Sequence, residues 1–554
     1  MSRNSSSKQP IKFWKHGVML MAGAALLSKL IGALQKIPLQ NIAGDRVFGI
    51  YNAVYPFYQL IAVLATAGLP TAVSIIIAQR LREGRAAEEA RPALIAAMLL
   101  LGASGLIAFC FMWVSADLTA VLIGDKSSAA AIRILSLALL IVPFAAVLRG
   151  YMQGRRQMGL SAASQVAEQV MRVAVMLLAL EVGIVAGWSE SALAAGVMSG
   201  ATAGAFVALV LLVVLGWPMR TKRSNRTAIG FRRLLREMKE LVILAVPATL
   251  AALVIPAIGV VDAFMVPRLL RESGLGEAGA MSMFGIYSRA QPLVQLIVMV
   301  AGAAAAALVP GLVAARVSND YKTFGLRLSL LVRLAWTVGA AAALGLVLLA
   351  DPLNRMFYMD GKETLTFALI GCTALAGCAN AVFAPALQAL GSARVPIALL
   401  LLAALLKGAL NAALVPSLGI EGAALSGVAA LSAAAILGAA AIRHAAAGFR
   451  TPHVRTGRLA GMRPAAGAIV ALVVMASAVL LSQRAVNAAL GYSLSPRATA
   501  TALALTGAAV GAFVFAAAAL RGGIVSAPEW RVLPGGEGLA ARLRRLRLIP
   551  PSEQ

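Results

Sequence analysis

The sequence carries little charge for its length. Of its 554 residues, 13% are Asp, Glu, Lys or Arg and 60% are hydrophobic. Soluble domains carry about 25% charged residues, so this composition excludes an ordinary water-soluble fold. Apolar runs of about 18 or more residues recur along the chain, and that length crosses a bilayer. The sequence therefore predicts a polytopic membrane protein.

Cysteine and histidine are also scarce, with three of each. Cys372 and Cys378 are six residues apart, which is not a metal-ligand spacing, and the histidines do not cluster. The sequence contains no HExxH motif, Walker A loop or nucleophile elbow. We therefore expect no catalytic residue, no metal site and no cofactor, and predict that the protein is not an enzyme. Transport would then draw on an ion or voltage gradient, or on the substrate's own gradient.

Acidic residues are scarcer than basic residues. There are 22 Asp and Glu against 49 Lys and Arg, a formal net charge of +27. In a soluble protein this excess would suggest nucleic acid, but no nucleic-acid-binding signature accompanies it. Cytoplasmic loops of membrane proteins collect Lys and Arg whatever the substrate. We predict no nucleic-acid partner.

Fourteen apolar runs predict an all-α integral membrane fold of about 14 transmembrane helices. The runs are 16–43, 50–78, 92–116, 131–151, 157–182, 191–217, 239–266, 281–310, 325–350, 364–390, 396–416, 423–443, 463–483 and 497–520. An even number puts both termini on one side. If that side is cytoplasmic, the inside segments hold about four times as many Lys and Arg as the outside loops, which favours this orientation.

Similar features recur at offsets of 231 to 240 residues, including Pro70 with Pro310 and Gly154 with Gly391. Such recurrence predicts two pseudo-repeated six-helix lobes plus a C-terminal helix pair, with a substrate site where the lobes meet. The predicted parts are an N-terminal lobe 1–217, a basic cytoplasmic linker 218–238, a C-terminal lobe 239–443, a cytoplasmic loop 444–462, an extra helix pair 463–520 and a basic cytoplasmic tail 521–554. Near its end the tail contains ARLRRLRL, which is typical of a segment attracted to anionic lipids.

Charged residues deep within the spans are mainly basic. Each costs roughly 2.5–3.5 kcal/mol at the bilayer centre, so it requires a partner or a hydrated cavity. The deep basic residues are Lys29, Lys36, Arg172, Arg289 and Lys407, and the acidic exceptions are Glu168 and Asp262. Lys29 and Lys36 are seven residues apart, which predicts one helix face and a separation of about 10 Å along the axis. A cationic cavity suited to a phosphate or diphosphate is the favoured interpretation.

Polar side chains at helical spacing are predicted to line the same cavity. They are Asn52, Gln59, Gln165, Glu168, Gln169, Gln291 and Asn411. A structural alternative stays open for several of these residues. Glu168 and Arg172 have the spacing of a salt bridge within one helix, and Arg289 and Lys407 can pair with acids across helices. Asp262 can pair with a lysine or bind a coupling cation.

Three segments carry a family resemblance: SKLIGALQKIPL (28–39), LRGYMQGRRQMGLSAASQVAEQVMRV (148–173) and VVDAFMVPRLL (260–270). They resemble the polysaccharide-exporter branch of the multidrug/oligosaccharidyl-lipid/polysaccharide (MOP) superfamily, and more narrowly its SpoVB and MurJ-type proteins. The resemblance implies a two-lobe flippase that works by alternating access and binds the diphosphate of a lipid carrier through basic residues. Lys29 and Lys36 match the basic positions of the first span, and Arg268 matches the basic residue of the VPR motif. The last two helices would form a groove for the lipid tail.

The leading hypothesis is a flippase of the bacterial plasma membrane for undecaprenyl-diphosphate-linked sugars, with the peptidoglycan precursor lipid II as first choice. Its partners would be the lipid-linked oligosaccharide, membrane lipids and cell-wall synthases, in cell-wall or spore-cortex assembly. A cation-coupled multidrug antiporter of the MATE branch is one alternative, for which Asp262 is the supporting feature. A membrane scaffold that transports nothing is the other.

Overall fold

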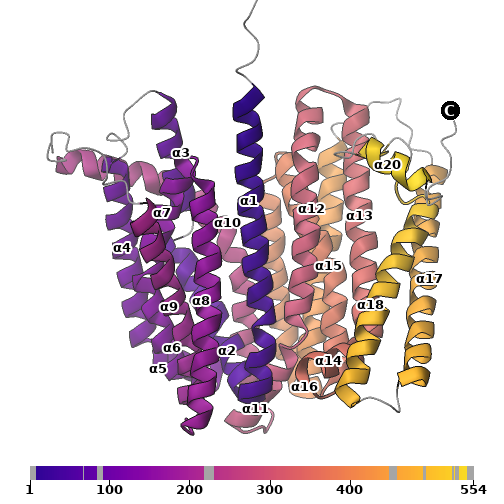
Figure 1. The fold of residues 1–554 in the computed structure, drawn as a ribbon, viewed down its shortest axis with the longest axis horizontal. Helices are drawn as coiled ribbons and strands as arrows, with labels where there is room; N and C mark the ends of the chain where they lie inside the picture. The colour runs from indigo at the N-terminus through magenta and orange to yellow at the C-terminus, as the bar shows by residue number, and fades with distance from the viewer. Residues whose placement is uncertain are drawn as a thin grey trace, which may run out of the picture. The chain divides into compact units, whose positions relative to one another are not determined.

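The computed structural model describes residues 8–66, 68–83, 91–216, 230–447, 458–490, 495–526, 529–530 and 536–545, and over these residues the chain is built of helices joined by short turns. The chain divides into two compact units, Met1–Gly285 and Ile286–Gln554. Figure 1 shows the helices of each unit. The predicted all-α membrane fold is confirmed.

The first unit is a helix bundle in which α8 packs along α9, α1 along α8, and α10 along α2. Its helices are α1 (Lys8–Leu34), α2 (Lys36–Thr66), α3 (Leu69–Arg82), α4 (Arg91–Val114), α5 (Ala116–Ile123), α6 (Ser128–Ser136), the 3₁₀ turn η2 (Leu137–Leu140), α7 (Val142–Gly154), α8 (Met158–Val185), α9 (Glu190–Gly216), α10 (Phe231–Glu272) and α11 (Glu277–Tyr287). A core of apolar side chains from α3, α4 and α7 closes one part of this bundle.

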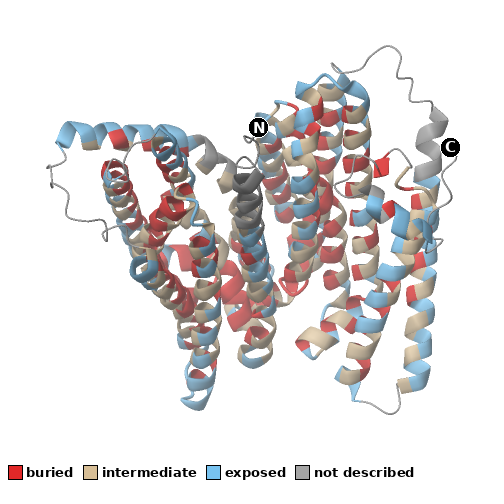
Figure 2. Cartoon of the chain, turned by 45° about the horizontal axis from the view of Figure 1, so that its top comes forward, coloured by how far each residue is buried: buried red, intermediate tan, exposed pale blue. Residues whose placement is uncertain are grey.

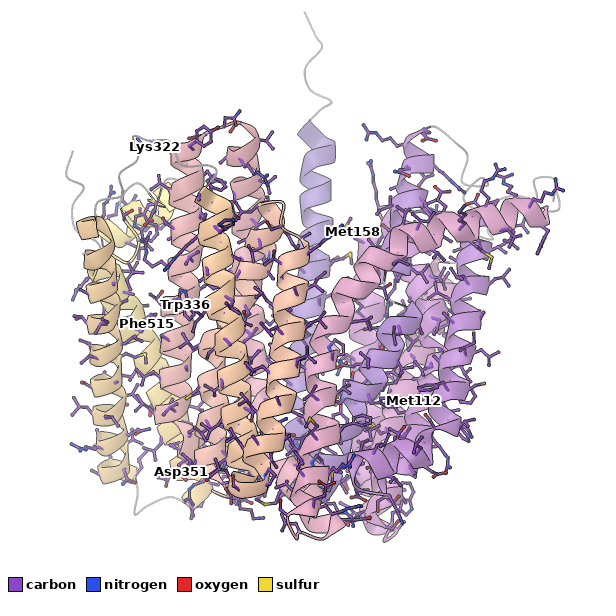
Figure 3. All side chains as sticks on the ribbon, turned by 180° about the vertical axis from the view of Figure 1, so that it is seen from behind. Met112, Met158, Lys322, Trp336, Asp351 and Phe515 are labelled. Atoms are coloured by element: carbon purple, nitrogen blue, oxygen red, sulfur yellow. The ribbon has the colours of Figure 1, made fainter. Side chains whose placement is uncertain are left out.

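The second unit packs α15 against α12, α13 and α16, and pairs α17 with α18. Its helices are α12 (Gln291–Val317), α13 (Tyr321–Leu348), α14 (Ala350–Tyr358), α15 (Thr364–Ala389), α16 (Arg394–Ala447), α17 (Arg458–Leu490), α18 (Pro496–Arg521) and α20 (Gly536–Arg545). Helix α16 folds back at Gly419, whose φ of 60° is left-handed. Figure 3 shows Lys322 at one end of α13 and Asp351 just beyond its other end.

In the described part of the chain, each of the fourteen predicted spans consists mainly of helix, with short turns inside several of them. Among the described residues, ten stretches are long and apolar enough to cross a bilayer. Two of these stretches, Leu20–Arg82 and Arg394–Ala447, each contain two predicted spans. The predicted spans 157–182 and 239–266 correspond to α8 and α10. The fold therefore agrees with a fourteen-helix membrane protein.

Prolines set four breaks inside the predicted spans. A proline cannot donate a hydrogen bond to the carbonyl four residues earlier, and its ring clashes with that carbonyl. Helix α1 ends at Leu34, α2 at Thr66, η2 at Leu140 and α11 at Tyr287. The prolines that follow these ends are Pro38, Pro70, Pro143 and Pro292, so each helix ends three to five residues before a proline. The first break corrects a prediction, because Lys29 lies in α1 and Lys36 begins α2 rather than sharing one helix.

Large apolar side chains cover the outer faces of the helices. Figure 2 shows exposed residues in pale blue along these faces, and exposed Leu, Ile, Val and Phe side chains occur on most of the long helices. On α17 and α18 they include Ile469, Leu481, Leu505 and Phe513. In water such surfaces would be unfavourable, whereas lipid chains solvate them.

The predicted lobes and the compact units divide the chain differently. The first unit continues through α10 to Gly285, because α10 packs on α2, α3 and α4. The lobes describe a proposed repeat of the sequence and the units describe packing, so the predicted division stays a prediction. Residues 218–229 of the predicted linker 218–238 lie outside the described residues. The same is true of residues 448–457 of the predicted loop 444–462.

Candidate functional site

A polar network in the first unit begins at the break between α1 and α2. The Lys36 ammonium donates to Asn52 Oδ1 at 2.8 Å and lies 5.9 Å from the ring centroid of Tyr51. Gln35, the turn residue of the break, donates to the Tyr51 hydroxyl at 2.9 Å. Gln169 on α8 donates to Gln35 Oε1 at 3.3 Å. The break is therefore held by two helices, and no salt bridge joins Lys36 to a described residue.

The same network continues along α8 to a carboxylate shared by two arginines. Glu168 Oε1 accepts from Arg172 Nη2 at 2.7 Å, and Glu168 Oε2 accepts from Arg149 Nη2 at 2.7 Å. Arg149 also donates to Ser164 at 2.9 Å, and Arg172 donates to the Tyr55 hydroxyl at 3.0 Å. The Nε of Arg172 is buried without a hydrogen bond. One negative charge is thus shared by two positive charges, which leaves a net positive charge on the three side chains.

Three tyrosines of α2 form the aromatic side of the network. The rings of Tyr51 and Tyr55 stack with centroids 5.5 Å apart, and Tyr58 follows at 6.0 Å from Tyr55. Positions four and three residues apart share one helix face, so the tyrosines form a row. This row presents hydroxyl groups to Arg172 and Gln35, and the ring face of Tyr51 to Lys36.

Glycines of α9 let α8 approach closely at the charged residues. Gly200 and Gly204 are four residues apart, the spacing of small residues at membrane helix contacts. A Cβ atom at Gly204 would lie 2.5 Å from the Glu168 carbonyl oxygen and 3.2 Å from Arg172 Cβ. The absence of side chains at Gly200 and Gly204 therefore allows the α8 backbone to pack directly against α9 at Glu168 and Arg172.

The other predicted residues of the first unit lie in different surroundings. Lys29 and Gln59 are exposed, Gln165 is half-buried, and Asp262 on α10 is buried. Arg268 is exposed and pairs with Glu272 one turn later, at 2.9 Å. The structure thus brings Lys36, Asn52, Glu168, Gln169 and Arg172 into one network, whereas a role for Lys29, Gln59, Gln165 and Arg268 in substrate binding stays a prediction.

In the second unit, Arg289 is a fully buried cation with an acidic partner. It lies in the turn between α11 and α12 and donates from both terminal nitrogens to Asp360, with Nη2 3.3 Å from Oδ2. Its guanidinium carbon lies 5.2 Å from the ring centroid of Tyr358, whose hydroxyl donates to the Arg289 carbonyl at 2.7 Å. Arg289 therefore has the surroundings of a structural ion pair, one of the two alternatives left open above.

Asp360 lies outside the spans, in the turn before α15. Burial acts to raise the pKa of its carboxyl, but hydrogen bonds from Arg289 and from the Lys362 backbone outweigh burial and hold the pKa below its ordinary value. Burial raises the pKa of the Tyr358 hydroxyl. At neutral pH the Asp360 carboxylate is therefore ionised and the Tyr358 hydroxyl is neutral.

The remaining predicted residues of the second unit lie on α12 and α16. Lys407 and Asn411 are buried one turn apart in the first half of α16, and Lys407 lies close to Gly427 in the second half. Gln291 is the first residue of α12 and is half-buried. A single cavity formed by residues of both units stays a prediction.

Sequence reasoning missed Arg149, Tyr51 and Asp360. Arg149 lies in the apolar run 131–151. That position, within the motif LRGYMQG, was a signal that could have found it. Asp360 could not have been found from spacing, because it lies 71 residues from Arg289.

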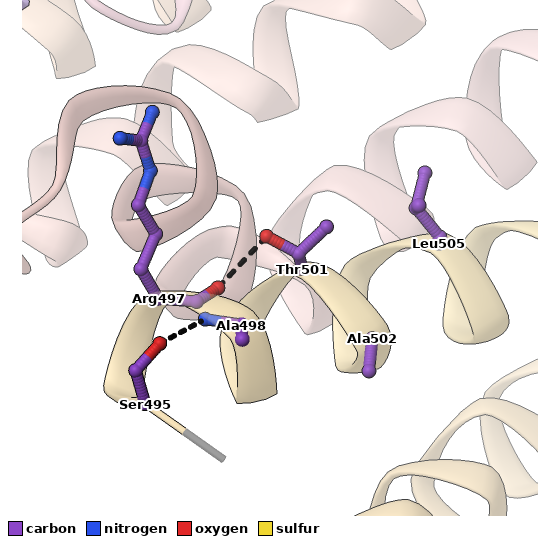
Figure 4. A pocket seen from close by; sticks show the side chains of 6 residues that line it. All are labelled: Ser495, Arg497, Ala498, Thr501, Ala502 and Leu505. Carbon is purple, nitrogen blue, oxygen red and sulfur yellow. Dashed lines mark hydrogen bonds between the residues drawn. The ribbon is translucent and has the colours of Figure 1, made fainter.

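Of two cavities lined by described residues, one lies in the network of the first unit and the other lies in the second unit. A small one of about 10 Å³, room for roughly one water molecule, is lined by Gln35, Tyr51, Tyr55 and Arg172 with apolar neighbours. A larger, open pocket of about 510 Å³ lies on the first turns of α18 (Figure 4). Its one charged residue, Arg497, already donates to the Met356 carbonyl at 3.2 Å. The smaller cavity is the one lined by residues of the polar network.

Known proteins similar to this chain fall in one group. The family model described as "Polysaccharide biosynthesis protein" matches residues 14–315. Three relatives are from Bacillus subtilis (strain 168). "Uncharacterized membrane protein YabM" is 31% identical over 534 residues, 96% of each chain. "Lipid II flippase MurJ" is 27% identical over 368 residues, 63% of this chain and 66% of that one. "Stage V sporulation protein B" is 24% identical over 418 residues, 74% of this chain and 80% of that one.

Solved structures share the fold. A lipid II flippase MurJ in the inward closed conformation aligns with a TM-score of 0.62 and 14% identity, covering 90% of this chain and 97% of that one. An inward-facing multidrug resistance MATE transporter of the MOP superfamily aligns with a TM-score of 0.61 and 16% identity, covering 77% and 96%. At these identities the likeness concerns the fold alone.

Proposed function

This chain belongs to the polysaccharide biosynthesis protein family, in the exporter branch of the MOP superfamily, and from that premise we propose that it moves undecaprenyl-diphosphate-linked sugars from the inner to the outer leaflet of the bacterial plasma membrane. Lipid II is the first choice of substrate, because one relative is named a lipid II flippase. A relative named for stage V of sporulation supports a role in cell-wall or spore-cortex synthesis. The named relatives support a transporter rather than an enzyme.

The observation that carries this proposal is the charge balance around Glu168. Arg149 and Arg172 share its one carboxylate, and the Lys36 ammonium is bound by an amide oxygen rather than an acid. A membrane interior disfavours unbalanced charge. Positive charge retained there requires an anionic ligand or water for compensation, and a lipid diphosphate supplies such an anion.

The break before Lys36 adds to this preference. Lys36 is the first residue of α2, so its backbone lies at a helix N-terminus, where N–H groups carry partial positive charge. Discontinuous helices whose N-terminal ends face anionic substrate groups are a recurring design of transporters. We propose that a phosphate binds at this end of α2, with Asn52 released from Lys36.

Arg172 would complete the diphosphate site by exchanging partners. A guanidinium binds carboxylate and phosphate with the same geometry, so a phosphate can replace Glu168 as the partner of Arg172 while Arg149 keeps the carboxylate. The unpaired Nε of Arg172 offers a further donor. Binding by exchange is weaker than binding to a bare cation, which suits a site that must also release its substrate.

The test of this proposal is a binding competition. The purified protein in nanodiscs would be loaded with fluorescent lipid II, and undecaprenyl diphosphate, undecaprenyl phosphate and an uncharged polyprenol would compete. We expect displacement by the diphosphate, weaker displacement by the monophosphate and none by the polyprenol. Equal displacement by all three would show that the lipid tail alone is bound and would remove the role of the cations.

A cation-coupled multidrug antiporter is the second candidate, favoured by the buried Asp262 on α10. Organic cations require an available carboxylate, and Glu168 is already shared by two arginines. If Asp262→Asn abolished drug resistance conferred by the protein while lipid II binding persisted, the antiporter would be the better account.

A further inference from the structure

The end of the second unit beyond α18 is anchored to α13 through one buried acid. Glu529 accepts from Arg333 Nη2, lies 3.5 Å from the Ser329 hydroxyl and accepts from its own segment at Ser526 N, at 2.7 Å. Its side chain is 3% exposed. Trp530, the next residue, is buried as well. The chain after α18 is therefore fixed against α13 before α20 begins.

Helix α20 follows this anchor and presents arginines to the outside. Ala540 is buried, whereas Arg542, Arg544 and Arg545 are exposed. Helix α20 lies at the end of the second unit where α18 ends and α13 begins (Figure 1), and Lys322 marks that end in Figure 3. A helix with one apolar and one basic side is typical of the interface between membrane and water.

The topology brings further basic residues to the same end. Helix α14 follows the end of α13 and packs on the start of α18. The start of α13 and the end of α18 therefore both lie at the other end of the second unit, where α20 is. Helix α16 begins where α15 ends and folds back at Gly419, so both of its termini lie there as well. The exposed basic residues are Lys322, Arg394, Arg443 and Arg521. Among the described residues of these termini, Asp320 is the exposed acid.

We propose that α20 and these basic residues, here called the basic end, dock on acidic phospholipid headgroups of the adjoining leaflet. The Glu529–Arg333 pair and Trp530 hold α20 at headgroup level. Each arginine near an anionic surface favours the bound state about fivefold, and three together favour it roughly 100-fold. Acidic phospholipid is the partner of matching charge that is present wherever this protein is embedded.

The test uses the full chain with Cys110, Cys372 and Cys378 replaced by serine and an environment-sensitive fluorophore on Ala541→Cys. Nanodiscs would contain phosphatidylcholine alone or with added phosphatidylglycerol. We expect phosphatidylglycerol to increase and blue-shift the emission, and salt to reverse the change because it screens exposed charges. A label on Ser417→Cys, exposed where α16 folds back at the opposite end, is the matched control and should not respond.

Two variants locate the effect. The triple variant Arg542→Gln/Arg544→Gln/Arg545→Gln should lose the response to phosphatidylglycerol, and Glu529→Gln should weaken it while leaving the elution of the folded protein unchanged. Emission that does not change when phosphatidylglycerol is added would overturn the proposal and would favour a protein as the partner of α20. A full response in the triple variant would also overturn it, because apolar insertion would then explain the signal. Neither result bears on lipid II binding.

Discussion

Glu168 and Arg172 lie one turn apart on α8, with Glu168 Oε1 2.7 Å from Arg172 Nη2, and the other carboxylate oxygen binds Arg149 of α7. The carboxylate therefore couples two helices and leaves the pair of arginines with a net positive charge. If a substrate phosphate replaces Glu168 as the partner of Arg172, the ion pair between Glu168 and Arg149 still joins α7 and α8.

Replacing Glu168 by glutamine should destabilise the first unit. The variant removes the negative charge from two charge-assisted hydrogen bonds, each of which contributes about 1.5–3 kcal/mol, so we expect a clear fall in melting temperature in detergent. Glu181→Gln is the matched control, since Glu181 is exposed on the same helix. Equal melting temperatures for the two variants would show that the shared carboxylate does not stabilise the bundle.

A side chain at Gly204 should separate α8 from α9. Gly204→Val places atoms against the Glu168 backbone and Arg172 Cβ, and overpacking of this kind costs roughly 1–3 kcal/mol. Melting temperature and lipid II binding should fall together. Gly345→Val on α13, where no atom lies within 4 Å of the added Cβ, should change both far less; a comparable loss there would point to helix propensity rather than packing.

The membrane fold was predictable from composition and from the length of the apolar runs. The helix breaks near prolines were predictable only in part. The end of α1 at Leu34 agrees with the effect of Pro38, but Pro56 and Pro310 lie inside α2 and α12, so the position of prolines alone does not locate the breaks. The partners of buried charges were not predictable in the same way. Glu168–Arg172 follows helical spacing, whereas the contacts of Arg149 and Arg289 depend on which helices pack together. Pairwise packing is fixed by side-chain shape across the whole bundle, which one sequence does not reveal.

The Arg289–Asp360 pair should make the second unit sensitive to acid. The folded state lowers the pKa of Asp360, so its stabilisation is complete above the ordinary aspartate pKa of about 3.9 and is lost as pH falls through the lower folded value. Melting temperature measured from pH 7 to lower pH should fall in the wild type, and Asp360→Asn should remove this part of the dependence.

At neutral pH the same variant should cost about 3 kcal/mol, because it leaves the fully buried Arg289 without its counter-charge. Asp351→Asn is the control, since Asp351 and Arg355 form a half-exposed pair that contributes little. Melting curves of Asp360→Asn that overlay those of Asp351→Asn would contradict the assignment of Asp360 as the counter-ion.

The orientation proposed from charge, with both termini cytoplasmic, gives opposite outcomes at two exposed lysines. In a background without native cysteines, Lys126→Cys should react with a membrane-impermeant maleimide added to whole cells, and Lys322→Cys should react only after the cells are opened. The reverse pattern would invert the topology.

Translocation of fluorescent lipid II in proteoliposomes tests the central claim most directly. Wild type and the control Lys126→Gln, an exposed loop lysine, should move lipid II across the bilayer at the same rate. The double variant Lys36→Gln/Arg172→Gln should insert and elute normally but lose at least about tenfold in rate, because two charged contacts to the diphosphate are removed. Translocation by the double variant at the wild-type rate would contradict the account.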